Sequence, residues 1–302
     1  MSLRRGGQIV IATTCLALLL PFAPPAAAAF PGANGKIAFD SDRSGNFDIY
    51  TIESDGTNVV QLTTNSASDV DPGWSADGTK IAFTSYRNGN ADVYTMNADG
   101  TGLTRFTSNG TFDGYPGWSP DGTRIVFTSL RSGNLDIWVK DIGATTATQL
   151  TTSNWDDFGA VWSPDGSKLL FTSNRSGSSD VWSMNPDGTA QTQVTTNSAA
   201  DGWPSYSPDG ASFAFESNRS GDFEVWTRKV SGGSATRLTT NAAFDGYPAW
   251  SPDGTKITFV TDRSGSLDVY VMNADGTGVT RYTKKSGVDE SPDWQPLPAT
   301  GG

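Results

Sequence analysis

The sequence contains no histidine, and its single cysteine, Cys15, lies in an apolar segment near the N-terminus. Serine hydrolase triads use histidine as their general base, and zinc sites are built mainly from histidine and cysteine. The missing residues therefore exclude His-dependent triads, zinc sites and thiol chemistry, and we expect no cofactor and no metal ion. Since a lone cysteine has no partner within the chain, we also predict a fold without disulfide bonds.

Positive charge is scarce as well. The chain has 21 Lys and Arg against 32 Asp and Glu, which gives a net charge of -11. A surface with this excess of negative charge repels the phosphates of nucleic acids and the head groups of anionic lipids. We therefore predict that neither nucleic acid nor a membrane is a partner of the mature protein.

A strongly apolar run occurs at the N-terminus. Arg4 and Arg5 precede apolar residues 9–20, and four alanines follow at positions 26–29. A charged segment, a short apolar segment and a small-residue cleavage site, in that order, are typical of a secretory signal peptide. We predict a signal peptide over residues 1–29 and a mature protein that is secreted or periplasmic. The paired arginines leave both the general and the twin-arginine export routes open.

The rest of the chain repeats one pattern with a fixed period. Large aromatic residues recur 44 residues apart at Trp74, Trp118, Trp162, Tyr206, Trp250 and Trp294. Within one repeat, short β-type runs at 115–119, 124–129, 136–140 and 148–151 are separated by turns rich in Asp, Ser and Gly. A period of this length, built from short apolar runs and Gly-rich turns, is typical of a β-propeller with one blade per repeat. We predict an all-β fold of four-stranded blades.

The two ends of the repeat region complement each other. The first repeat, from Phe30, lacks the strand that carries the repeated aromatic residue, and the last repeat stops at Trp294 just after such a strand. We predict that the C-terminal strand completes the N-terminal blade, because closure removes two open sheet edges. This gives a six-bladed propeller over residues 30–296 and a tail over 297–302. The tail contains Leu-Pro-Ala-Thr-Gly, which matches a sortase signal, but no apolar segment and basic tail follow it.

The repeated residues resemble a known family. The pattern Pro-x-Trp-Ser-Pro-Asp-Gly, Ile-Ala-Phe, Asp-Arg-Ser-Gly-Asn-x-Asp-Ile-Tyr and Asn-Ala-Asp-Gly-Thr is similar to the WD-like propeller repeat of TolB-type proteins, and it covers residues 30–296. The resemblance implies a six-bladed propeller that binds a protein or an envelope polymer. TolB proteins also carry an N-terminal α/β domain, which we expect this chain to lack.

Two charged positions recur in every repeat. An arginine follows the second strand and an aspartate precedes the innermost strand, as in Arg131 and Asp113. Both loops emerge on one face of a propeller, so each arginine can pair with a carboxylate of its own or the adjacent blade. The acid that opens the third strand, such as Asp136, offers a second partner. The alternative is a ring of carboxylates that holds a cation over the channel.

Once histidine, zinc and thiol chemistry are excluded, carboxylates remain as candidate catalytic groups. Glycosidases need two carboxylates with different roles. The most evident aspartates here are repeated six times, whereas a catalytic pair is normally singular, and the chain has only four glutamates. The sequence therefore favours a protein that is not an enzyme, with a cell-envelope glycosidase or lyase that uses channel carboxylates as the alternative.

Aromatic residues in the loops before the innermost strands do not follow the repeat. We predict that they form a ligand-binding surface at one mouth of the channel, for a peptide or a glycan. The alternative is that the rings cap the core between blades. Trp155 is the strongest candidate, because the equivalent positions in other blades hold small residues. The predicted binding residues are Phe112, Tyr115, Trp155, Asp156, Phe158, Trp203, Phe244 and Tyr247.

The combined prediction is an exported, TolB-like propeller that acts as a binding scaffold. Its expected partner is another envelope or secreted protein, or a glycan, and we expect the propeller to be a monomer.

Overall fold

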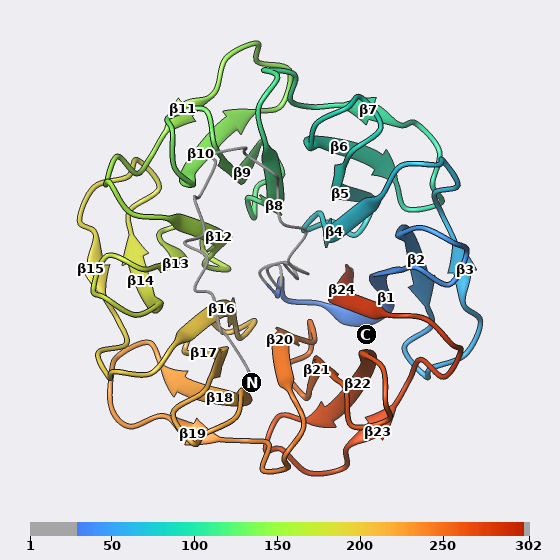
Figure 1. The fold of residues 1–302 in the computed structure, drawn as a ribbon, viewed down its shortest axis with the longest axis vertical. Coiled ribbons are helices and arrows are strands. Elements are labelled where there is room, and N and C mark those ends of the chain that lie inside the picture. The colour runs from blue at the N-terminus through green and yellow to red at the C-terminus, as the bar shows by residue number, and fades with distance from the viewer. Residues whose placement is uncertain (1–28, 299–302) are drawn as a thin grey trace, which may run out of the picture.

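The computed structural model of the protein describes residues 29–298, so residues 1–28 of the predicted signal peptide lie outside the described residues. The described chain forms six four-stranded sheets arranged around a central channel (Figure 1). Each sheet is one blade, and the architecture is the predicted six-bladed β-propeller. Within residues 29–298, no helix has the length and hydrophobicity needed to cross a membrane.

Every blade uses its strands in the same order, from the channel outward. The innermost strands are β4 (Asp69–Trp74), β8 (Asp113–Trp118), β12 (Asp157–Trp162), β16 (Asp201–Tyr206), β20 (Asp245–Trp250) and β24 (Asp289–Leu297). The second strands are β1 (Ala33–Ser41), β5 (Lys80–Ser85), β9 (Arg124–Ser129), β13 (Leu169–Ser173), β17 (Ser212–Ser217) and β21 (Lys256–Thr261). The third strands are β2 (Asp48–Ile52), β6 (Asp92–Asn97), β10 (Asp136–Asp141), β14 (Asp180–Met184), β18 (Glu224–Lys229) and β22 (Asp268–Asn273). The outer strands are β3 (Val60–Gln61), β7 (Thr104–Arg105), β11 (Thr148–Gln149), β15 (Thr192–Gln193), β19 (Thr236–Arg237) and β23 (Thr280–Arg281).

Strand boundaries differ slightly from those that the pattern predicts. In the third repeat the innermost strand begins at Asp113 instead of Tyr115, because Asp113 already pairs with the end of β9. The outer strand spans two residues instead of the predicted 148–151. Leu150 still contacts the third strand beyond this ladder, since its amide donates to the carbonyl oxygen of Ile137 at 2.8 Å.

The C-terminal strand closes the ring, as predicted. β24 pairs antiparallel with β1 from Ala33 opposite Leu297 to Ser41 opposite Asp289, and Ile37 lies opposite Trp294. The first blade therefore has the strand order β24-β1-β2-β3, with its innermost strand taken from the other end of the chain. This pairing leaves no open edge between the first and the last repeat.

The core lies between neighbouring blades. One fully buried phenylalanine occupies the same position of each second strand, at Phe39, Phe83, Phe127, Phe171, Phe215 and Phe259. The repeated aromatic residue of each innermost strand packs into the adjacent interface, and Trp74, Trp162 and Tyr206 are at most 2% exposed. The 44-residue period is thus the spacing of one repeated interblade contact.

The closure generates the first testable prediction. Trp294 is 3% exposed and lies on β24, so Trp294→Ala should lower the free energy of unfolding by about 3–5 kcal/mol. Leu297→Ala is the matched control, because that side chain lies at the end of the same strand and is 39% exposed. Thermal and urea unfolding of both variants measures the difference. Equal melting temperatures for Trp294→Ala and the wild type would contradict a closing role for β24.

Candidate functional site

A ring of ion pairs surrounds the channel on one face of the propeller. We call this the upper face, and it is formed by the turns between second and third strands and by the loops that lead into the innermost strands. In one blade Nη2 of Arg131 lies 2.7 Å from Oδ2 of Asp113, and its Nε donates to Oγ of Ser129 at 2.9 Å. The five equivalent pairs are Arg43–Asp289, Arg87–Asp69, Arg175–Asp157, Arg219–Asp201 and Arg263–Asp245. The predicted pairing of these repeated charges is confirmed.

The arginine of each pair also packs on aromatic rings of its own blade. Cζ of Arg131 lies 5.3 Å from the ring centre of Phe127 and 4.6 Å from that of Trp138. The acid that opens the third strand is not its second partner, contrary to the prediction. Asp136 instead accepts hydrogen bonds from the side chains of Ser132, at 2.5 Å, and Thr151, at 2.9 Å. Asp136 therefore contacts the residues next to the outer strand, and Arg131 pairs with Asp113 of the innermost strand.

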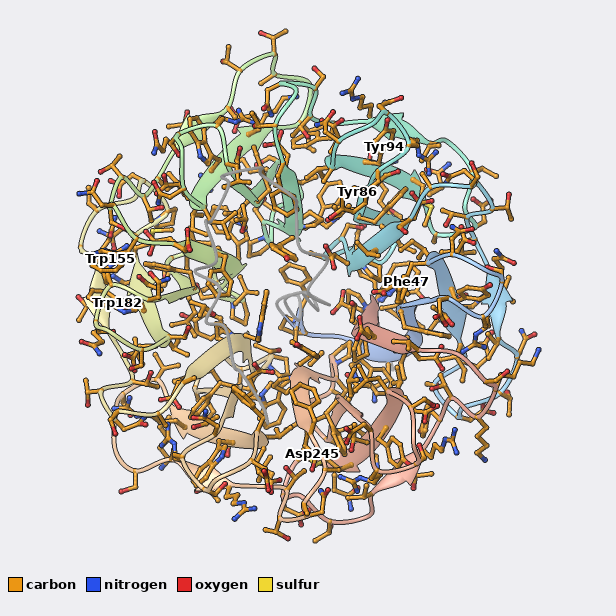
Figure 2. All side chains as sticks on the ribbon, viewed as in Figure 1. Phe47, Tyr86, Tyr94, Trp155, Trp182 and Asp245 are labelled. Atoms are coloured by element: carbon orange, nitrogen blue, oxygen red, sulfur yellow. The ribbon has the colours of Figure 1, made fainter. Side chains whose placement is uncertain are left out.

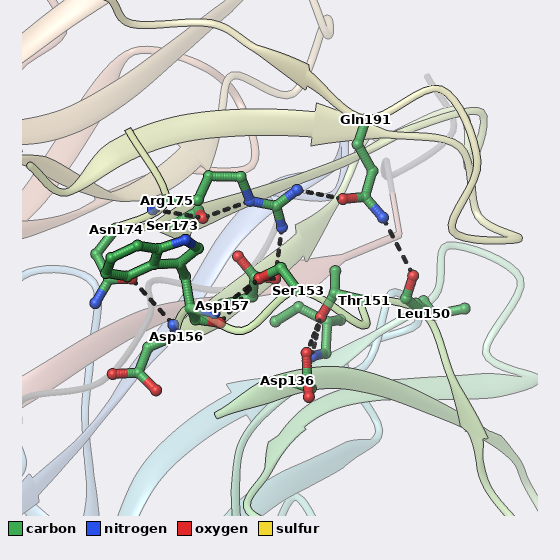
Figure 3. A network of polar contacts seen from close by, with 12 residues as sticks. Asp136, Leu150, Thr151, Ser153, Asp156, Asp157, Ser173, Asn174, Arg175 and Gln191 are labelled. Atoms are coloured by element: carbon green, nitrogen blue, oxygen red, sulfur yellow. Dashed lines mark hydrogen bonds and ion pairs between the residues drawn. The ribbon is translucent and has the colours of Figure 1, made fainter. Parts of the chain in front are cut away.

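The ion pairs neutralise the carboxylates that are repeated around the ring. Figure 3 shows one such network, in which Arg175 contacts Asp157, Ser173 and Gln191. Each aspartate of the ring is fully buried and is matched by the guanidinium of one partly buried arginine side chain. The repeated aspartates are therefore structural, and any site chemistry must come from residues that break the repeat.

Six of the predicted binding aromatics gather into one cluster at the channel, which we call the aromatic arc. Trp203 is its centre, with its ring centre 5.4 Å from that of Tyr115, 5.1 Å from Phe158 and 5.8 Å from Tyr247. Two further contacts extend it, Phe112 to Tyr115 at 5.5 Å and Phe244 to Tyr247 at 5.4 Å. Tyr115 and Trp203 are 5% and 7% exposed, and the other four are half-buried.

Trp155 lies apart from this cluster. It is 54% exposed and is the only exposed residue among the ten tryptophans of the chain. Figure 2 places it at the outer part of the ring, away from the channel. Its neighbour Asp156 is half-buried and shapes the loop, since Oδ1 accepts from the amide of Leu135 at 3.1 Å and its own amide donates to Asn174 at 3.0 Å. The predicted single surface is thus two surfaces, a channel cluster and an outer tryptophan.

A backbone irregularity aims one side chain of each innermost strand into the channel. The six equivalent residues all have positive φ, between 52° and 64°, and the strand register shifts there: Asp71, Tyr115, Gly159, Trp203, Tyr247 and Ser291. Positive φ costs a non-glycine residue about 1–3 kcal/mol, so the packed ring must hold this geometry. Tyr115 and Trp203 come from β8 and β16, which flank β12 (Figure 1). Their rings are in contact although the blade that carries Gly159 lies between them. We infer from this contact that the positive-φ residue of each innermost strand points into the channel.

The opposite side of the channel is acidic. Asp71 and Ser291 occupy the same inward position on β4 and β24, and Asp40 and Glu290 lie beside them. We call these four residues the acidic arc, and each is at most 5% exposed. Burial raises the pKa of Asp40 to about 7 and that of Glu290 to about 8, and the nearby carboxylates add to both shifts. Burial, followed by the charges of Asp40 and Glu290, raises the pKa of Asp71 well above its usual range.

Sequence reasoning missed the acidic arc, although a signal for it exists. The inward position reads Asp, Tyr, Gly, Trp, Tyr, Ser around the ring, although the position after it is proline in five of the six blades. A second position also departs from the repeat, with threonine at 84, 128 and 172 but Asp40, Glu216 and Val260 in the other blades. Each of the three threonine hydroxyls accepts a hydrogen bond from the amide of the inward residue of the next blade, whereas Asp40 and Glu216 do so with a carboxylate at 3.3 Å. Asp40 at this position marks the acidic side of the channel, and Glu216 holds Tyr247 of the aromatic arc.

Two further buried acids have strongly shifted pKa values. Burial raises the pKa of Glu216 to about 8, opposed by the hydrogen bond from the amide of Tyr247. Burial likewise raises the pKa of Asp293 to about 8, and its Oδ2 accepts the amide of Trp74 at 2.6 Å. Among residues 29–298, no group of three or more candidate ligands is arranged to hold a metal ion.

Comparison with known sequences identifies the repeats. A family profile described as the TolB β-propeller domain matches residues 23–115 and 109–201 of the chain. No curated protein sequence matches significantly. The match covers more than half of the chain and includes Phe112, Tyr115 and Phe158 of the aromatic arc.

Solved structures share the fold at low sequence identity. TolB from Acinetobacter baumannii superposes with a TM-score of 0.76 at 22% identity, over 87% of this chain and 67% of that one. A TolB protein from Agrobacterium tumefaciens gives 0.70 at 23% identity, over 85% and 91% of the two chains. An oligogalacturonate lyase from Vibrio parahaemolyticus gives 0.59 at 14% identity, over 87% and 79%. At these identities the likeness concerns the fold alone.

The raised pKa values predict that acid stabilises the propeller. Between pH 4.5, the ordinary pKa of a glutamate, and about 8, folded Glu216 holds a proton that the unfolded chain releases. Its contribution to stability is therefore complete at low pH and falls by about 1.4 kcal/mol per pH unit through that window. The melting temperature should decrease from pH 5 to pH 8. Glu216→Gln, which keeps an oxygen for the amide of Tyr247, should make the decrease smaller, while Glu53→Gln should not, because that side chain is 38% exposed and pairs with Lys36 at the surface. An unchanged slope in Glu216→Gln would contradict the assignment.

Proposed function

Because the chain belongs to the TolB β-propeller family, we propose that it is an exported binding scaffold. Its partner in this proposal is another envelope or secreted protein, or a glycan, bound at the upper face. The N-terminal sequence pattern supports export. The excess of acidic over basic residues disfavours nucleic acid and anionic lipid as ligands.

One observation carries the proposal, namely the exposure of Trp155. Nine of the ten tryptophans are buried or half-buried, whereas Trp155 is 54% exposed. Its backbone is held firmly, since its carbonyl oxygen accepts from Nδ2 of Asn134 at 2.7 Å and from Oγ of Ser153 at 3.0 Å. A rigidly held, exposed tryptophan loses little entropy on binding, and such residues are common energetic anchors of protein interfaces.

The aromatic arc supplies the second part of the binding surface. Phe112, Phe158, Phe244 and Tyr247 are half-buried around the more deeply buried Trp203. Rings that pack against each other form a preorganised apolar surface, which a partner contacts without reordering side chains. We propose that a partner spans the outer Trp155 and this arc, with Asp156 between them as a polar contact.

The proposal makes a prediction for one residue. Trp155→Ala should leave the melting temperature within a degree or two of the wild type, because the side chain is exposed. It should weaken partner binding by about 2 kcal/mol or more, which is the loss expected for an anchor residue. Ile142→Ala is the matched control, since Ile142 is a 48% exposed apolar residue on the opposite face. Capture of a partner from envelope extract, and a glycan array, compare the three proteins at equal concentration.

Two outcomes would count against this assignment. Equal capture by Trp155→Ala and the wild type would remove Trp155 from the binding surface. A loss of stability of about 3–5 kcal/mol in Trp155→Ala would show that its ring belongs to the core.

A second candidate function is a cell-envelope glycosidase or lyase. It is favoured by the presence of buried, non-equivalent carboxylates, because the raised pKa of Glu290, about 8, suits a proton donor near neutral pH. This candidate predicts that the wild type cleaves an acidic polysaccharide such as oligogalacturonate, and that Asp71→Asn does not. Measurement of reducing and unsaturated ends, with Asp222→Asn at an exposed position as the control, would decide it. No cleavage by the wild type over long incubation would exclude this activity.

A further inference from the structure

The channel has two chemically different sides. Of the six inward residues, Tyr115, Trp203 and Tyr247 carry rings, and their contacts form a continuous wall. Ser291 and Asp71 lie on β24 and β4, which are neighbours in the ring (Figure 1). Because the inward position is equivalent in all six blades, the carboxylate of Asp71 enters the same channel as the aromatic wall.

The charge on the acidic side has no counter-ion. Asp69 and Asp289, next to this side in the sequence, each pair with an arginine at 2.8 and 2.6 Å. Within residues 29–298, no ion pair includes Asp40, Asp71 or Glu290. Three buried carboxylates without a cation are costly in a folded protein unless a proton or a bound positive group neutralises them.

Two buried polar atoms on this side also lack hydrogen-bond partners. Oδ1 of Asp71 and Oγ of Ser291 are buried and have no hydrogen-bond partner of normal geometry among residues 29–298. The two residues are 4% and 2% exposed. The hydroxyl of Ser291 lies near Asp40 and that of Thr84 near Asp71, and each lowers the pKa of that carboxyl without offsetting the effect of burial. More than nine in ten buried polar groups in proteins are paired, so two orphans at adjacent inward positions indicate an absent partner rather than packing. A partner that suits both is a hydrogen-bond donor with positive charge.

The aromatic side comes close to the same carboxylate. The negative charge of Asp71 adds to the effect of burial in raising the pKa of Tyr115, and likewise raises the pKa of Tyr86 to about 12. Both phenols therefore lie within electrostatic range of Asp71. A positive group beside Asp71 would therefore lie among carboxylates and close to the phenol groups of Tyr115 and Tyr86.

We propose that the acidic arc, with the nearby phenol of Tyr115, binds the cationic end of a lysine or arginine side chain that a partner protein inserts into the channel. This inference rests on the proposed binding function and names the chemistry of the ligand. Asp71 and Ser291 supply the hydrogen-bond acceptors, and Asp40 and Glu290 supply further negative charge. A metal ion fits less well, since no group of three candidate ligands among residues 29–298 has the geometry to hold one.

The test uses short peptides as probes and isothermal titration calorimetry as the readout. The probes are acetyl-Gly-Gly-Lys-Gly-Gly-amide, its arginine counterpart and its norleucine counterpart, which has the length of lysine without the charge. We expect one of the cationic probes to bind at least about tenfold more tightly than the norleucine probe. The better of the two identifies the cation as ammonium or guanidinium.

Variants locate the binding. Asp71→Asn is nearly isosteric, and burial already favours the neutral form of Asp71, so the variant should fold as the wild type does, which its melting curve checks. It should weaken binding of the cationic probe at least about tenfold, and Ser291→Ala should weaken it less, since it removes a hydrogen bond and no charge. Asp222→Asn is the charge-matched control, because Asp222 is exposed on the turn between β17 and β18, and it should bind as the wild type does.

Three results would overturn the inference: equal affinity for all three probes, unchanged affinity in Asp71→Asn, or heat of binding with calcium chloride but with no peptide. The outcome is separable from that of the proposed function. A partner that is captured equally well by the wild type and Asp71→Asn would leave the scaffold function standing and remove this site. If the cationic probe binds the wild type but not Asp71→Asn, and no partner is captured, the site stands and the scaffold function does not.

Discussion

Backbone pairing between β24 and β1 holds the two ends of a circular structure together. Each blade buries its apolar faces only against its neighbours, so the ring is stable only if the last repeat meets the first. The chain achieves this by placing the innermost strand of the first blade at its own C-terminus, with Ile37 opposite Trp294. Since every innermost strand lines the channel, this pairing also sets the geometry of the channel and of both arcs.

The repeated residues and the unrepeated ones have separate tasks. The arginine–aspartate pairs, the buried phenylalanines and the positive-φ position recur in each blade and build the same frame six times. That frame fixes an inward-pointing residue on each innermost strand, at a cost in backbone strain that packing offsets. The identity of the inward residue is then free to vary, and its variation from Trp203 to Asp71 gives the channel an aromatic and an acidic side.

The acidic side reduces stability at neutral pH. The buried carboxylates of Asp40 and Asp71 form no ion pair with an arginine of the described chain, and Asp40 stands where three other blades have threonine. A packed apolar or hydroxyl residue would stabilise the ring more, and sites of this kind are commonly retained for binding.

The sequence by itself determined the number of blades, the strand order, the closure and the arginine–aspartate ring, because each follows from a pattern repeated every 44 residues. It also singled out Trp155, because the equivalent positions of the other blades hold small residues and the repeated packing therefore needs no large side chain there. Tertiary structure alone decided that Trp203 packs with rings from three other strands while Trp155 stays outside, and that Asp40, Asp71 and Glu290 share one side of the channel. These facts depend on contacts between residues far apart in the chain, across a channel whose width and curvature no local pattern encodes.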